Sequence, residues 1–125
     1  MKKIGYQKII KDEILAKEES IKFFKKIKEQ SLFCKEITVS STIKIADKKS
    51  DMSFKYENVQ IEPTDVHIKD DNIQIDVFDK FAFFINTNCT NFKFNLQEIP
   101  SENSTILCIR YDINDIIKNI IYISF

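Results

Sequence analysis

The spacing of apolar residues changes twice along this chain, from a helical period to a strand period and back to a helical period near the C-terminal end. From Gln7 to about Ser31, apolar residues recur at helical spacing, and lysines and acids occupy most positions between them. This pattern predicts one long amphipathic helix. We expect its apolar stripe to pack on a sheet of the same chain, with the lysines in solvent. The predicted stripe consists of Ile10, Ile14, Ile21 and Phe24.

After this segment the apolar period becomes two, which is typical of strands with one buried face. The first such run covers 37–45. In the next run, the apolar residues of 54–56 and those of 59–61 have opposite parity. A bulge or tight turn near Glu57 and Asn58 is therefore needed if one face stays buried. The remaining predicted strands are 65–69, 73–78, 81–85, 92–96 and 105–111.

The C-terminal segment DINDIIKNIIYISF returns to helical spacing. Asp112 stands where a helix N-cap would be expected, which favours a short final helix. The many β-branched residues leave a strand open as the alternative. The residues that would form the apolar side of the helix are Ile113, Ile116, Ile117, Ile120 and Ile121.

These elements predict a single α+β domain over residues 1–125. Short polar links between the strands favour antiparallel pairing, because parallel crossovers need a dozen residues or more. We expect an N-terminal amphipathic helix packed on a curved antiparallel sheet of six or seven strands, followed by the short C-terminal helix. Seven strands and then a helix is also the element order of a pleckstrin-homology-like barrel, which stays open as an alternative topology.

The only histidine lies in a predicted hairpin whose register follows from its apolar residues. Pairing Ile68 with Ile73 places the aliphatic side chains of both strands on one face. In this register His67 lies opposite Gln74. Continued by two residues, the register also sets one carboxylate against another on the polar face, a repulsion that a bound partner could relieve. The two acids are Asp65 and Asp76.

The next predicted hairpin has the loop NTNCTN and one aromatic face. Its apolar pairs would be Ile85 with Phe92, Phe83 with Phe94, and Phe81 with Leu96. We expect this face to belong to the core. Phe84 points the other way, where it is either covered by another element or exposed as an anchor for a partner.

The charge of the chain is balanced overall but divided along its length. Lys and Arg number 19, and Asp and Glu also number 19. Residues 1–50 carry a net charge of +6 and residues 51–125 a net charge of −6. From Glu57 to Asp79 there are seven acids and a single lysine, Lys69. We therefore expect a negative surface suited to a basic partner, and neither nucleic acid nor a membrane as the ligand.

No motif of known chemistry is present. Three cysteines, Cys34, Cys89 and Cys108, have no spacing that suits zinc and are expected to be free thiols in a reducing compartment. The lysine-rich start lacks the apolar stretch of a secretory leader, and no apolar run approaches the ~20 residues that cross a bilayer. We expect a cytoplasmic protein without metal, cofactor or catalytic residues.

The function that fits these features best is protein binding. A compact domain with an acidic face is typical of an immunity or antitoxin-type inhibitor that neutralises a basic, nuclease-like toxin. The alternative is a curved-sheet module that binds a lipid headgroup or small ligand on its basic N-terminal half, and the third is a small hydrolase or nuclease. The predicted partner-binding residues are Glu62, Asp65, His67, Asp70, Asp71, Asp76 and Phe84.

Overall fold

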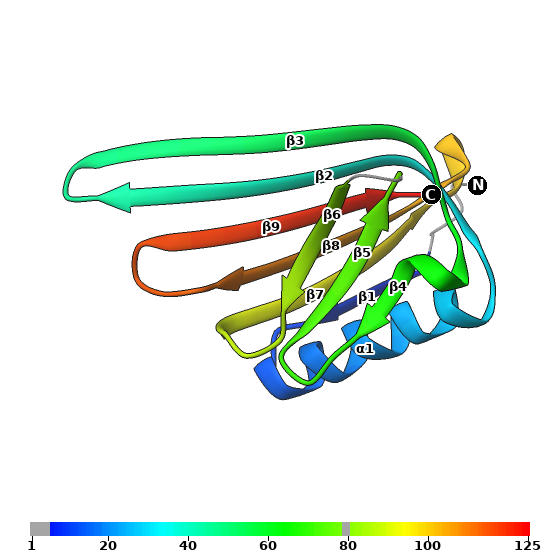
Figure 1. Cartoon of the computed structure of the whole chain (residues 1–125), viewed down its shortest axis with the longest axis horizontal. Coiled ribbons are helices and arrows are strands. Elements are labelled where there is room, and N and C mark those ends of the chain that lie inside the picture. The colour runs from blue at the N-terminus through cyan, green and yellow to red at the C-terminus, as the bar shows by residue number, and fades with distance from the viewer. Residues whose placement is uncertain (1–5, 79–80) are drawn as a thin grey trace.

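A computed structural model describes residues 6–78 and 81–125, in which nine strands form two antiparallel sheets with one α-helix (Figure 1). The six-stranded sheet has the order β1-β7-β8-β9-β2-β3, and the three-stranded sheet has the order β4-β5-β6. Two short 3-10 helices, η1 (Pro63–Asp65) and η2 (Pro100–Glu102), connect strands. The longer elements are β1 (Gln7–Ile10), α1 (Glu13–Glu29), β2 (Leu32–Ile45), β3 (Lys48–Ile61), β4 (Val66–Ile68), β5 (Asn72–Val77), β6 (Phe81–Asn86), β7 (Thr90–Ile99), β8 (Ser104–Asp112) and β9 (Ile117–Ser124).

The predicted helix is present but shorter. It begins after Asp12, whose carboxylate accepts a hydrogen bond of 2.9 Å from the Leu15 N–H. The preceding residues form β1, which pairs with β7 at the edge of the six-stranded sheet. The predicted stripe was wrong in part, because Ile14 is 70% exposed and the buried face is rotated from it. That face consists of Ala16, Ser20, Phe24 and Ile27.

The two longest strands, β2 and β3, form a hairpin that changes its buried face at one point. Val59 is buried, whereas Phe54 lies on the opposite parity and lines the inner side of the hairpin. Asn58, between them, has a positive φ of 54°. A left-handed residue is tolerated best by Asn among the non-glycine residues, which explains the residue type at this kink. The change of face predicted near Glu57 and Asn58 is present, but the predicted bulge or turn is not, because β3 is continuous there and its register with β2 does not shift.

The three-stranded sheet confirms one predicted hairpin and contradicts the other. Ile68 pairs with Ile73 and His67 with Gln74, as the apolar pattern indicated. However, β6 pairs with β5 and β7 pairs with β8 and β1, so β6 and β7 belong to different sheets. Phe83 and Phe94 are still both buried, because they face one core from opposite sides. Parity predicted the burial of these two residues, but it failed for Phe81, which is 58% exposed, and it did not determine the pairing partner.

The predicted C-terminal helix is wrong. The segment forms β9, which pairs with both β8 and β2 inside the six-stranded sheet. Here Ile121 and Ile123 are fully buried, which is the period of a strand. Two neighbouring strands offer backbone hydrogen bonds that a helix would leave unmade, and β-branched residues suit this environment. With a strand at this end, the element order no longer matches the pleckstrin-homology-like alternative.

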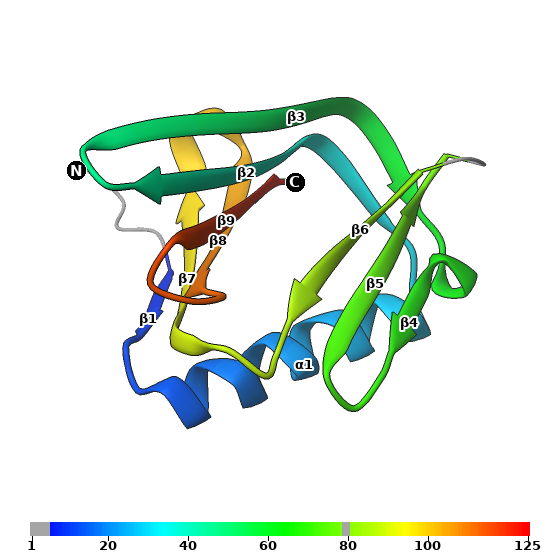
Figure 2. The same cartoon turned by 60° about the vertical axis from the view of Figure 1, so that its left-hand side comes forward.

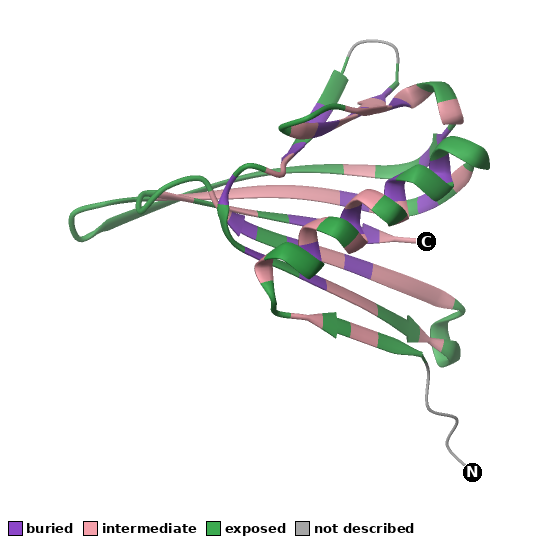
Figure 3. Ribbon diagram, turned by 90° about the horizontal axis from the view of Figure 1, so that it is seen from below, coloured by how far each residue is buried: buried purple, intermediate pink, exposed green. Residues whose placement is uncertain are grey.

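The core lies between the two sheets and α1 (Figure 2). Buried positions follow the inner side of the helix and the central strands, whereas the β2–β3 hairpin extends beyond them and is mostly exposed (Figure 3). The molecule is therefore mainly antiparallel sheet with one helix packed against it. Within the described ranges, no helix combines the length and the apolar character that a membrane span requires.

Candidate functional site

The only histidine and three neighbouring side chains lie together on the outer face of the three-stranded sheet. His67, Gln74 and Phe84 occupy neighbouring register positions on β4, β5 and β6. The His67 Nε2 lies 2.9 Å from Asp76 Oδ2, and the Gln74 amide donates to Asp76 Oδ1 at 3.0 Å. These hydrogen bonds, that of His67 above all, lower the pKa of the Asp76 carboxyl. This acid is therefore stabilised as a carboxylate by its own neighbours.

The predicted opposition of Asp65 and Asp76 is absent. Asp65 belongs to η1, where its carboxylate accepts a hydrogen bond of 2.8 Å from the Glu62 N–H. Glu62 in turn accepts from the Ser31 hydroxyl. The two acids cap the short helix that Pro63 begins, and β4 starts only at Val66. Local capping therefore explains both residues without a partner.

The other predicted acids lie at the opposite end of β4. Asp70 and Asp71 form the turn before β5, and both are exposed. Glu57 is already paired with Lys55, whose Nζ lies 3.3 Å from its carboxylate. Asp79 lies outside the described residues. The acids available to a partner are therefore the turn pair, whereas Asp76, which is paired with His67, lies near the other end of β5.

One edge of β6 has no strand beside it in the part of the chain that is described. The Thr87 N–H donates to the Asp71 carbonyl at 2.9 Å, which places the odd-numbered residues of this region in the hydrogen-bonded pairs with β5. The backbone groups of Ala82, Phe84 and Asn86 consequently point away from β5. The N–H groups of this row and the Ala82 carbonyl can pair with an additional strand. The Phe84 carbonyl already accepts from the Tyr111 hydroxyl, and the Asn86 carbonyl accepts from the Cys89 thiol.

A groove of about 500 Å³ runs beside this edge, between β6 and the concave side of the six-stranded sheet. It is lined mainly by apolar side chains, and no charged residue among those that the structure describes lines it. Phe54 is 54% exposed, Phe81 is 58% exposed and Phe84 is 52% exposed. Phe81 was predicted to be buried, but β6 has no neighbour on this side to cover it. The apolar residues of the groove are Val39, Phe54, Tyr56, Phe81, Ala82, Phe83, Phe84, Tyr111 and Ile113, with Asn86 and Asn119 as polar members.

Tyr111 connects the two sheets within the groove. Its hydroxyl donates to the Phe84 carbonyl at 3.3 Å and accepts from the Asn119 amide at 3.3 Å. Burial raises the pKa of this phenol, so it stays a neutral donor. Elsewhere, the rings of Tyr56 and Phe78 meet edge to face with centroids 6.3 Å apart. These contacts tie the two sheets together across the groove, so its shape is formed before a partner binds.

The titratable groups form no recognised catalytic arrangement among the described residues. No group of three metal-ligating side chains comes together there. Cys34, Cys89 and Cys108 are free thiols, as expected. Burial raises the pKa of Cys34 to about 12 and that of Cys89 to about 11, so both remain protonated near neutral pH. The His67 and Asp76 pair lies on an open sheet face rather than in a pocket.

Sequence reasoning placed Phe84 correctly on the side away from the core, where it is exposed, but missed the groove beside it. The groove depends on which strand β6 pairs with, and the apolar pattern could not decide between β5 and β7. One signal was present, because the run FAFFI at 81–85 carries aromatic residues on both parities. A strand with one solvated face needs aromatics on only one.

Comparison with known proteins gives no relative from which a function can be carried over. No protein-family model, no curated protein and no solved structure matches the chain. The proposals below therefore depend on the chain's own residues.

Proposed function

We propose that this protein is a protein-binding domain that takes an extended segment of its partner along the β6 edge. The observation that carries the proposal is an unpaired strand edge beside a preformed apolar groove of about 500 Å³. In strand addition, the backbone groups of the edge supply hydrogen bonds, and neighbouring pockets take alternate side chains of the guest strand. The outward N–H and carbonyl of Ala82, the outward N–H of Phe84 and the groove beside them supply both requirements.

A protein suits the groove better than a small ligand because the exposed apolar surface continues beyond it. Met52, two residues before Phe54 on β3, has the same parity and is 55% exposed. Ile113, at the β8 end of the groove, is 43% exposed. Contiguous exposed apolar surface of this kind marks interaction sites, and aromatic side chains dominate the binding energy of protein interfaces.

The charge around the β6 edge favours a basic partner. Asp76 is paired with Ala82 across β5 and β6, and the exposed turn acids Asp70 and Asp71 lie at the end of the same sheet. Lys69 is the one lysine in this stretch. Complementary charge at the rim of an apolar contact accelerates association and selects among partners. Glu62 and Asp65, which cap η1, contribute to the negative potential rather than to direct contact.

In its most specific form, the proposal is that the domain inhibits a basic toxin in the cytoplasm. The acids Asp70, Asp71 and Asp76 would face the positive surface with which a nuclease binds its substrate. The apolar groove would hold a segment of the toxin beside that surface. Three free thiols fit a reducing compartment. The open sheet face around His67 gives no comparable support for an enzyme.

The first experiment captures the partner without assuming its identity. A photo-crosslinking amino acid is placed at Phe84 in cells of the native host, and the matched variant carries it at Ile14, which is 70% exposed on α1. We expect an adduct with one protein at position 84 alone, through a segment flanked by Lys or Arg. Absence of any adduct beyond that seen at position 14 would contradict the proposal.

The second experiment tests strand addition with the purified captured partner. Ala82→Pro removes one outward N–H and no hydrogen bond to β5, a position where an edge strand tolerates proline. We expect binding to weaken at least ~tenfold, because the guest strand loses a backbone hydrogen bond. Ala82→Ser keeps the N–H and should bind like the native protein. Equal affinity of the proline and serine variants would exclude pairing along this edge.

A third pair of variants tests the sign of the partner's charge. Asp70→Lys with Asp71→Lys should slow association most strongly at low salt, because steering attraction becomes repulsion. The control is Glu18→Lys with Glu29→Lys, which makes the same change in net charge at exposed sites on α1. Equal slowing by both pairs would mean that only the net charge matters and that the acidic turn is not the contact.

A further inference from the structure

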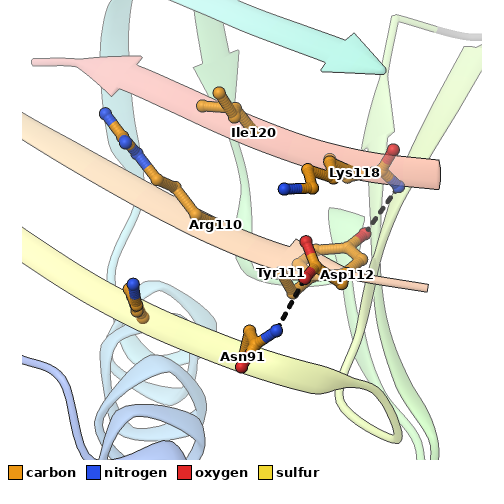
Figure 4. Close-up of a pocket in the computed structure, with 8 residues that line it drawn as sticks. Asn91, Arg110, Tyr111, Asp112, Lys118 and Ile120 are labelled. Carbon is orange, nitrogen blue, oxygen red and sulfur yellow. Dashed lines mark hydrogen bonds between the residues drawn. The ribbon is translucent and has the colours of Figure 1, made fainter. Parts of the chain in front are cut away.

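Three cations gather on the outer face of the six-stranded sheet, on the side opposite the groove. Lys93, Arg110 and Lys118 come from the adjacent strands β7, β8 and β9, and all three are exposed. Figure 4 shows Arg110 and Lys118 on the latter two strands. Tyr111 and Asn119 border both hollows, but the Tyr111 hydroxyl contacts Phe84 and Asn119 on the groove side. Arg110 and Lys118, one residue before each, therefore face the other way. The site is therefore separate from the β6 edge.

One pair in this arrangement is unfavourable without a ligand, whereas Lys118 lies directly opposite the acid Asp112. Lys93 and Arg110 are direct cross-strand partners, and like charges in that position destabilise a sheet. Within the described residues, none of the three cations has a carboxylate oxygen within 4.0 Å. The one acid of the cluster, Asp112, accepts a hydrogen bond of 2.7 Å from the Asn91 amide. The four charged side chains together carry +2 at neutral pH.

The cations surround a depression of about 390 Å³. This volume is within the ~300–1,000 Å³ range of small-molecule sites, and it exceeds what a single inorganic anion fills. The cations and Asn91 supply donors, and Ile120 supplies apolar surface. Arg110 is the only arginine in a chain with eighteen lysines. Its planar guanidinium offers the paired N–H geometry that matches phosphate oxygens, which an ammonium group cannot reproduce.

We infer that this depression binds the phosphate or pyrophosphate group of a small phosphorylated compound or of a lipid headgroup. A phosphate monoester carries a charge of about −1.5 to −2 near neutral pH, which balances the +2 of the cluster. Arg110 donates two hydrogen bonds to the phosphate oxygens, and Lys93 and Lys118 bind the phosphate from the two neighbouring strands. Ile120 contacts the remainder of the ligand. The ligand relieves the Lys93–Arg110 repulsion. Binding at this site does not depend on the proposed partner of the β6 edge.

The test uses inorganic pyrophosphate as the probe, titrated into the full chain at low salt while backbone amide NMR signals are followed. We expect saturable shifts of amides near Lys93, Arg110 and Lys118. Arg110→Gln should weaken binding at least ~tenfold, and Arg110→Lys should weaken it too, because the charge is kept but the paired donors are lost. The control Lys25→Gln removes an exposed lysine from α1 and should bind like the native protein.

Two further results would overturn the inference. If pyrophosphate at millimolar concentration shifts no amide of this cluster, or if Arg110→Gln binds as tightly as the native protein, the depression is not a phosphate site. Misfolding of the variant is checked by its unfolding midpoint, which should be unchanged or raised because a like-charge pair is removed.

Vesicles distinguish the two sources of phosphate. Flotation with phosphatidic acid in phosphatidylcholine vesicles, lost in Arg110→Gln but not in Lys25→Gln, would identify a lipid headgroup. Pyrophosphate binding without flotation would identify a small compound in solution. If Arg110→Gln and Lys25→Gln reduce flotation equally and no pyrophosphate binds, vesicle binding depends only on net charge. That result would overturn the inference of a phosphate site.

Discussion

Adjacent phenylalanines on β6 give the sharpest test of how this strand is oriented. Phe83 is 6% exposed and faces the core, whereas Phe84 is 52% exposed and lines the groove. Emptying a buried phenylalanine site costs about 3–5 kcal/mol, so Phe83→Ala should remove a large part of the total stability of a small domain. Full burial of such a side chain is worth about 1.5–3 kcal/mol, so Phe84→Ala, which loses about half of it, should cost about 1 kcal/mol.

The assay is urea unfolding followed by far-UV circular dichroism, because the chain has four Tyr and no Trp for fluorescence. The unfolding free energies of the two variants should differ by about 2–4 kcal/mol, with similar denaturant slopes. If Phe84→Ala costs as much as Phe83→Ala or more, the two faces of β6 have been assigned the wrong way round. The groove would then lose its exposed anchor, and the proposed function would lose its main support.

Three other predictions concern the C-terminal strand, the acid response and the thiols. Ile121→Ala should lower the free energy of unfolding in urea by about 2–5 kcal/mol and Ile116→Ala by less than about 1 kcal/mol, because only Ile121 is buried. Similar losses for the two variants would favour a C-terminal helix instead of β9. The pKa of Asp76 is lower in the folded protein than its unfolded value of about 3.9. The hydrogen bonds to the Asp76 carboxylate therefore stabilise the fold above the unfolded pKa, and this stabilisation is lost as the pH falls through the folded pKa. The melting-temperature gap between native protein and Asp76→Asn should therefore be largest near pH 7 and shrink below about pH 4; a gap that is constant with pH would contradict this. Thiol titration in urea without reductant should find three reactive groups, and fewer than three would indicate a disulfide. In the folded protein at pH 8, Cys34 and Cys89 should resist modification because burial raises the pKa of both thiols.

Local pattern predicted the parts of this fold that depend on neighbouring residues. The register of His67 with Gln74 followed from aliphatic residues that must share one face. The change of buried face near Asn58 followed from a change of parity along β3. Both features are fixed within a few residues, so the apolar period contains enough information to specify them.

Features that depend on distant pairing were not accessible to the same reasoning. The isoleucines after Asp112 fit a helix or a strand equally well, and the neighbouring edges of β2 and β8 decide between them. The assignment of β6 to the smaller sheet likewise depends on competition between β5 and β7. Asp65 was misplaced for a simpler reason, because Pro63 begins a 3-10 turn in which an acid serves as a cap. Lys93, Arg110 and Lys118 are far apart in the acidic half of the sequence, and only the sheet brings them together.

Amide hydrogen exchange of Ala82 and Phe84 in the complex with the captured partner tests the central claim most directly. Their N–H groups lie on the unpaired edge, so they should exchange readily in the free protein. The carbonyl groups of a guest strand along β6 would accept hydrogen bonds from both N–H groups, so we expect their exchange to slow at least ~tenfold on binding. The exchange of Phe83 and Ile85, whose N–H groups already bond to β5, should change less. Unchanged exchange at Ala82 and Phe84 in a saturated complex would contradict strand addition at β6.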